Sequence, residues 1–244
     1  RANEVGDQLG MFLCRMHEGG MVKTELAPKS LIRETYLGKM LEYIDRIFNF
    51  VQRKETFSGN EITEEVQALL FENIGKIIQY QQKLTSFPAA YMHGDLHLRN
   101  IMVRGLEGNK EQGNLGLTFK LIDLEFLRAD GDAAFDLGQL IVDIDLVAHE
   151  EDRQVHFDAM MTLCSHINRC YSTLTPVRKD DTFDTRIELA KARALLRIAK
   201  GKTKRGYRFM ETDQRQQAHT MAEQVMMHAS AALGHLEAVT KAIC

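Results

Sequence analysis

The chain has 244 residues, of which 44% are hydrophobic and 27% charged, with a formal net charge of −3 at pH 7. This composition suits one globular domain, or a large lobe of a bigger one, and argues against disorder. The balance of charge lacks the basic excess of nucleic-acid-binding domains, and no apolar run reaches the length of a membrane span. We therefore expect no nucleic-acid partner, no membrane partner and a cytoplasmic location.

Three amphipathic helices are predicted in the first 80 residues. Apolar side chains recur at intervals of three and four over residues 5–16, 37–51 and 62–78, which is the spacing of one buried helix face. No strand pattern precedes residue 90. The first part of the chain is therefore predicted to be helical.

The most informative stretch follows these helices and reads His-Gly-Asp-Leu-His-Leu-Arg-Asn from His93 to Asn100. Phosphoryl transfer from ATP needs a carboxylate to orient and deprotonate the acceptor hydroxyl, and oxygen ligands to hold Mg²⁺ on the phosphates. Asp95 suits the first role and Asn100 the second, and their spacing is that of a kinase catalytic loop with Gly94 in place of its arginine. The alternatives are an ordinary loop carboxylate and a turn asparagine.

A β-hairpin is predicted directly after this loop. Residues 101–103 are apolar, residues 105–116 are rich in Gly and Asn, and residues 117–121 alternate apolar with polar. Such a hairpin would bring Asn100 and Asp123 together as oxygen ligands of one metal. Glu125 would point to the same side of a strand as Asp123 and reach a second metal or its water shell, with a structural ion pair as the alternative.

The rest of the chain is predicted to be helical, over residues 135–147, 155–171, 183–198 and 221–239. An acidic set is expected on a solvated helix face, with a cationic acceptor as the alternative partner: Asp143, Asp145, Glu150, Glu151 and Asp152. A basic run is expected at a solvated helix end and linker, with a phosphate or nucleic-acid contact as the alternative: Lys200, Lys202, Lys204, Arg205 and Arg208. The four cysteines have no paired spacing and are expected to be free thiols.

Two motifs together resemble the aminoglycoside phosphotransferase and choline kinase group, the small-molecule branch of the protein-kinase-like fold. The loop of that group typically reads H-G-D-x-H-x-x-N and its metal motif I-D-x-E, and both patterns are present at His93–Asn100 and Ile122–Glu125. The first motif and Phe135–Gly138 also resemble methylthioribose kinase. The resemblance becomes loose beyond Tyr171.

The resemblance implies an α+β, mainly helical fold, the C-terminal lobe of a protein-kinase-like fold with a short catalytic β-hairpin. It implies an ATP-dependent, Mg²⁺-requiring phosphotransferase acting on a hydroxyl of a small metabolite or aminoglycoside-like acceptor. Asp95 would then be catalytic, and Asn100, Asp123 and Glu125 would bind the metal. Further residues would brace the loop: His93, His97 and Asp136, the last by hydrogen bonds to the loop backbone, which is compatible with a helix N-cap.

Residues 1–244 are interpreted as this one lobe. No loop over the ATP phosphates and no paired strand lysine is visible in the sequence before His93. We therefore expect the N-terminal ATP-clamping lobe, the partner of this one, to be absent from the chain, and the isolated chain to be inactive. An apolar face near residues 5–13 and the strands beside His93 would then be exposed. The alternatives are a non-catalytic kinase-like binding module and, less favoured, a protein kinase, since Gly94 replaces arginine and no A-P-E motif follows Asp123.

Overall fold

The computed structural model describes residues 1–19, 28, 30–53, 60–84, 87–105, 116–150, 154–174 and 180–244. The chain divides into two compact units, each built from two separate stretches. Unit 1 contains Arg1–Pro28 and Ser86–Asp184, and unit 2 contains Lys29–Thr85 and Thr185–Cys244. The expected α+β, mainly helical fold with a short hairpin is confirmed, whereas nothing in the sequence patterning indicates the division into units.

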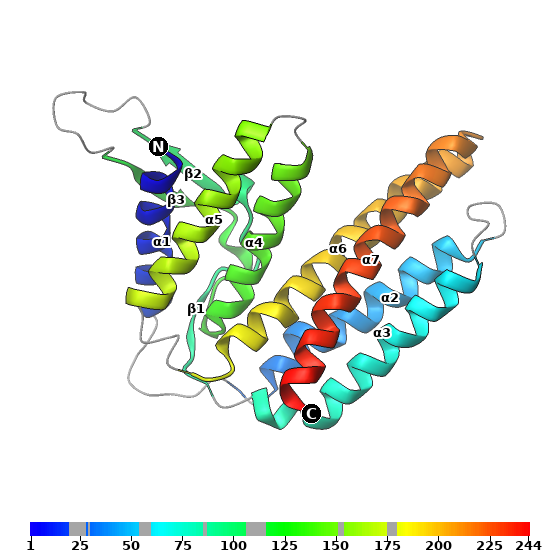
Figure 1. The fold of residues 1–244 in the computed structure, drawn as a ribbon, viewed down its shortest axis with the longest axis horizontal. Helices are drawn as coiled ribbons and strands as arrows, with labels where there is room; N and C mark the ends of the chain where they lie inside the picture. The colour runs from blue at the N-terminus through cyan, green and yellow to red at the C-terminus, as the bar shows by residue number, and fades with distance from the viewer. Residues whose placement is uncertain are drawn as a thin grey trace. The chain divides into compact units, whose positions relative to one another are not determined.

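Unit 1 combines three helices with two small antiparallel sheets (Figure 1). Its elements, in chain order, are α1 (Ala2–Gly19), β1 (Ala90–Met92), the 3₁₀ turn η3 (Leu98–Asn100), β2 (Ile101–Arg104), β3 (Thr118–Leu121), the 3₁₀ turn η4 (Leu124–Phe126), β4 (Arg128–Gly131), α4 (Ala133–Glu150) and α5 (Gln154–Leu174).

The predicted hairpin is confirmed as the pair β2 and β3. Ile101 faces Leu121 and Arg104 faces Thr118 in antiparallel register, and most of the predicted turn lies outside the described residues. A second pair, β1 with β4, was not predicted. Strands of three and four residues are too short to show the alternation on which strand prediction depends.

Helix α5 packs along α1 and buries its apolar face (Figure 1). Leu9 and Leu13 are only 3% and 0% exposed, so the expectation of an exposed apolar face on this helix is wrong, because a helix from far along the chain covers it. Exposed apolar side chains do occur on β2 and on the turn before β4: Met102, Val103, Leu124, Phe126 and Leu127.

Unit 2 is a bundle of four long helices (Figure 1). Helix α3 packs against α7, and α2 packs against both. The elements are the π-helical turn η1 (Ile32–Leu37), which runs directly into α2 (Gly38–Val51), α3 (Asn60–Tyr80), the 3₁₀ turn η2 (Gln81–Leu84), α6 (Phe183–Glu211), whose first residues belong to unit 1, and α7 (Arg215–Ile243).

Helix α6 is longer than the sequence pattern suggested. It was predicted to end near residue 198 but continues to Glu211, so the basic run lies inside a helix and not at a helix end and linker. The reason is that this part of the helix still has a buried face. Ala199 and Thr203 are almost fully buried, although charged residues surround them in the sequence. Lysine and arginine are also good helix formers, so they do not interrupt the helix.

Close approach of α6 to α2 depends on a glycine. A Cβ added at Gly206 would lie 2.1 Å from Cζ of Phe50, far inside van der Waals contact. Phe50 is fully buried and also meets the ring of Tyr207 edge-on, with centroids 5.0 Å apart. The missing side chain therefore lets the two helices share one aromatic contact. In the described part of the chain, no helix combines the length and hydropathy needed to cross a bilayer.

Candidate active site

The His-Gly-Asp loop begins where strand β1 ends, and a glycine is required in it. Gly94 has a φ of +82°, a left-handed conformation that residues with a Cβ rarely adopt. An added Cβ would also lie 2.7 Å from Cβ of Phe126 and 2.9 Å from its carbonyl oxygen. Both constraints explain why arginine, which kinase loops often have here, would not fit.

His93 connects this loop to the residue before Asp123. Its ring is fully buried. Nδ1 accepts a hydrogen bond from the backbone N–H of Asp95 at 3.3 Å, and Nε2 lies 2.9 Å from the carbonyl oxygen of Ile122. Because Nδ1 accepts and a carbonyl oxygen can only accept, the proton is on Nε2. One ring thus fixes the backbone of Asp95 against the start of the metal motif.

Asn100 makes a second connection between the same segments. The side-chain amide nitrogen of Asn100 donates to the backbone carbonyl oxygen of Asp95 at 2.9 Å. The backbone carbonyl oxygen of Asn100 accepts from the backbone N–H of Ile122 at 3.1 Å. The side chain is buried, with 6% exposed. Since the amide nitrogen is used within the loop, the side-chain oxygen of Asn100 is the atom left to act as a ligand.

Asp123 follows the end of β3 in an unusual conformation. Its φ of 61° and ψ of 57° are left-handed, which aspartate tolerates better than most residues. The residues after it form the 3₁₀ turn η4, so Asp123 and Glu125 are not on a strand, and the argument that they point to one side is wrong. Both residues are exposed. The role of Glu125 as a metal ligand stays a prediction.

Asp136 fixes the backbone of the loop by hydrogen bonds. Its carboxylate accepts hydrogen bonds from the N–H of His93 at 2.5 Å and of Gly94 at 2.9 Å. It lies in the first turn of α4, but the alternative N-cap role is wrong, because the helix begins earlier. Asp132 occupies that position, and its carboxylate accepts from the N–H of Ala134 at 3.0 Å.

Two residues that the site prediction missed continue this network. Nε2 of His17 lies 3.2 Å from Asp136, and Nδ1 of His17 lies 2.5 Å from the hydroxyl of Tyr171. Burial, reinforced by nearby thiols and carboxylates, raises the pKa of Tyr171 well above 10. The hydroxyl therefore stays protonated and donates a hydrogen bond to Nδ1 of His17. All three side chains are fully buried. Only the position of His17 at the end of the first helix was noticeable in the sequence.

The remaining polar residues near the loop have distinct contacts. Asp143 is half-buried and accepts a hydrogen bond from the N–H of Leu98 at 2.7 Å, so it supports the loop as well as facing solvent, and the alternative of a cationic acceptor stays a prediction. Asp145 is exposed and lies 3.6 Å from His149, whereas the side chains of Glu150, Glu151 and Asp152 lie outside the described residues. Nε2 of His97 is 3.9 Å from Asp95 Oδ2, which is too long for a hydrogen bond.

The donor set suits magnesium better than a tightly caged metal. Carboxylate oxygens of Asp123 and the amide oxygen of Asn100 are hard ligands of the kind that Mg²⁺ prefers. Among the residues that the structure describes, no three His, Cys, Asp or Glu side chains cluster so as to hold a metal ion. A cation that keeps several waters and shares phosphate oxygens needs only one or two protein carboxylates, so the residues present fit Mg²⁺.

Comparison with known proteins shows the family of the chain. The chain belongs to the phosphotransferase enzyme family, whose model matches residues 1–162 and so includes the loop, the hairpin and α4. No curated protein sequence matches the chain.

Solved structures show which known fold the chain resembles. A glucosamine kinase matches with a TM-score of 0.54 and 17% identity over 93% of this chain. An ethanolamine kinase of Plasmodium vivax matches with a TM-score of 0.49 and 12% identity over 95% of this chain. The chain spans 52% and 58% of the lengths of these two proteins, about half.

Proposed function

We propose that this chain carries the transfer centre of an ATP-dependent small-molecule kinase, which moves a phosphoryl group to a hydroxyl of a small metabolite or aminoglycoside-like acceptor. The observation that carries the proposal is the double connection of Asp95 to Ile122, once through the His93 ring and once through Asn100, whose side-chain amide contacts Asp95 and whose backbone carbonyl contacts Ile122. These hydrogen bonds hold a carboxylate and two metal-ligand candidates in one small region, which is what phosphoryl transfer requires of a protein.

In this proposal the reaction is an in-line displacement at the γ-phosphorus of ATP. The Asp95 carboxylate accepts a hydrogen bond from the acceptor hydroxyl and orients its oxygen toward the phosphorus. As the new oxygen–phosphorus bond forms and the bond to the ADP oxygen breaks, the hydroxyl proton passes to Asp95. Asn100 and Asp123 would hold Mg²⁺, which supplies charge neutralisation on the phosphate oxygens. Glu125 is proposed to assist through the water shell of the metal.

Rigid support of Asp95 is part of this proposal. Its backbone N–H is held by His93 and its carbonyl by Asn100, so the loop cannot rotate without breaking both bonds. Asp136 and Asp143 fix the loop on either side of Asp95 by accepting from Gly94 and Leu98. Catalytic groups need positioning to within about 0.5 Å, which requires neighbours of this kind.

The test is a coupled assay for ADP release with the full natural protein, ATP and Mg²⁺, run against a panel of amino sugars, amino alcohols and methylthioribose. We expect acceptor-dependent ADP release with one member of the panel or a close analogue, and transfer of the phosphoryl group to it, seen by ³¹P NMR. A protein that binds MgATP in calorimetry but never turns it over with any acceptor would support the alternative of a kinase-like binding module. The expected cytoplasmic location stays a prediction.

A further inference from the structure

A second candidate site lies in unit 2, between helices α2 and α6. It is a pocket of about 390 Å³, within the range of small-ligand sites. Residues of both helices line it: Arg46 and Asn49 from α2, and Lys200, Thr203, Lys204 and Tyr207 from α6. None of these belongs to the catalytic loop, the hairpin or the metal motif.

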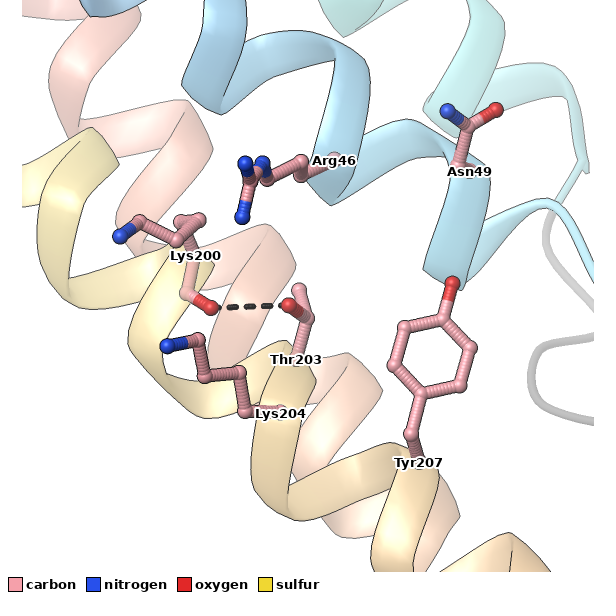
Figure 2. A pocket seen from close by; sticks show the side chains of 6 residues that line it. All are labelled: Arg46, Asn49, Lys200, Thr203, Lys204 and Tyr207. Carbon is pink, nitrogen blue, oxygen red and sulfur yellow. Dashed lines mark hydrogen bonds between the residues drawn. The ribbon is translucent and has the colours of Figure 1, made fainter.

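Three cationic side chains gather at this pocket. Figure 2 shows the Arg46 side chain extending from α2 toward α6, where Lys200 and Lys204 lie one helical turn apart. Burial lowers the pKa of Lys200, and the like charges of Lys204, Arg46 and Arg197 lower it further. A bound anion would offset the electrostatic repulsion between these like charges.

The carboxylate that pairs with Arg46 does not balance the three cations. Glu42 accepts from Arg46 at 2.9 Å, but it also pairs with Lys39 at 3.0 Å. Glu42 also raises the pKa of Lys200, against the like charges that lower it. One carboxylate shared in this way leaves a surplus of positive charge at the pocket.

The polar walls of the pocket are fixed by packing. The guanidinium of Arg53 lies 4.8 Å from the centre of the Tyr207 ring, and Phe50 meets the same ring edge-on. Figure 2 shows the Tyr207 ring rising from α6 toward Asn49 with its hydroxyl leading. The ammonium of Lys200 also lies 5.0 Å from the centre of the Tyr43 ring, which restrains its stem. Hydroxyl and amide donors thus accompany the cations in a preformed arrangement.

We propose that this pocket binds the phosphate group of a small phosphorylated metabolite. Two or three cations with neutral donors beside them suit the two negative charges and three oxygens of a phosphate monoester better than the single charge of a carboxylate. The volume leaves space for a small organic group attached to the phosphate. A nucleic acid fits less well, because the chain carries a net charge of −3 and the cations gather at one small pocket lined by six residues, whereas nucleic-acid binding usually uses an extended basic surface.

The test is isothermal titration calorimetry of the full natural protein with ribose 5-phosphate and with inorganic phosphate, at constant ionic strength and without Mg²⁺. We expect ribose 5-phosphate to bind and ribose not to bind. The double variant Lys200→Gln/Lys204→Gln should raise the dissociation constant at least tenfold. The matched control Arg205→Gln/Arg208→Gln removes the same charge from the same helix outside the pocket and should change it less than twofold. Arg46→Gln, on the other helix, should weaken binding in the same direction and serves if the double variant does not fold.

Three results would overturn the proposal. The first is the absence of ribose 5-phosphate binding at millimolar concentration. The second is equal weakening by the control variant, which would show a general charge effect. The third is tighter binding of a short RNA oligonucleotide that the Lys200→Gln/Lys204→Gln variant abolishes, which would assign the site to nucleic acid. An Asp123→Asn variant separates this site from the transfer centre, since it should leave ribose 5-phosphate binding unchanged whether or not the proposed kinase activity exists.

Discussion

The interactions inside unit 1 differ in kind from those inside unit 2. In unit 1 the central interactions are buried hydrogen bonds between polar groups, with His93, Asn100 and Asp136 almost fully enclosed. In unit 2 most of the core is an apolar seam between long helices, with fully buried residues such as Ile44, Ile47 and Leu236, although Arg186 and His228 are buried there as well. Buried polar networks specify one geometry and tolerate little change, whereas apolar packing tolerates substitution that conserves volume. The proposed transfer centre therefore lies in the unit whose loop geometry is fixed by directional bonds.

Asp95→Asn is expected to have the largest effect on activity, through the proposed transfer centre in unit 1. Because Asp95 is proposed to orient the hydroxyl and accept its proton, turnover should fall by about 10²–10⁴-fold, while the unfolding temperature changes little. The measurement is kcat in the ADP-release assay with the natural protein. Asp145→Asn, on an exposed face of α4, should stay within a few fold of the natural protein. Turnover by Asp95→Asn at a similar level would contradict the catalytic assignment.

Asp136→Ala should cause the largest loss of stability. It removes the acceptor of two buried backbone N–H groups and of the His17 ring. Each unsatisfied buried donor costs about 1–3 kcal/mol, so the free energy of unfolding should fall by roughly 3–5 kcal/mol. Urea denaturation followed by circular dichroism measures it. Asp145→Ala serves as the control on the same helix, and a loss below about 1 kcal/mol for Asp136→Ala would show that the network is not what stabilises unit 1.

Acid should destabilise unit 2 through one histidine. Burial, with Lys202 adding to it, lowers the pKa of His228 from 6.5 to about 4. Between these values the unfolded chain binds a proton that the folded protein does not, so stability is present above pH 6.5 and is lost progressively as the pH falls toward 4. The full difference corresponds to about 3 kcal/mol.

The measurement is the free energy of unfolding from pH 7 to pH 4.5. His228→Gln should flatten this pH dependence, whatever its effect on stability at pH 7. His219→Gln changes a more exposed histidine of the same helix, and it should leave the dependence as in the natural protein. An unchanged slope in His228→Gln would place the acid sensitivity elsewhere.

The smallest expected effects come from two glycines of the helical unit. Gly206→Ala forces a Cβ into the Phe50 ring and should cost about 1–3 kcal/mol by overpacking. Gly234→Ala, where nothing lies within 4 Å, should gain about 0.5–1 kcal/mol from helix propensity. Thermal unfolding distinguishes the two by sign. A gain for both would mean that α2 and α6 can separate at no cost.

Sequence patterns predicted most of the helices and the hairpin because apolar spacing depends only on neighbours along the chain. The candidate site was found for the same reason, since Asp95 and Asn100 are five residues apart in one motif. The His17–Tyr171 contact could not be predicted, because its residues are 154 positions apart and neither is unusual in its local sequence. The strand argument for Glu125 failed because a left-handed residue ended the strand first.

The assembly of unit 2 from two separate stretches has a consequence for synthesis on the ribosome. Helices α2 and α3 leave the ribosome first, but α6 and α7, which complete their core, follow only after all of Ser86–Asp184 has been translated. At about 5–20 residues per second this delay lasts several seconds or more, whereas a helix forms in about a microsecond. Throughout that interval the apolar faces of α2 and α3 lack the helices that cover them in the complete unit. The order of the chain thus leaves α2 and α3 without the helices that cover them for far longer than the two helices take to form.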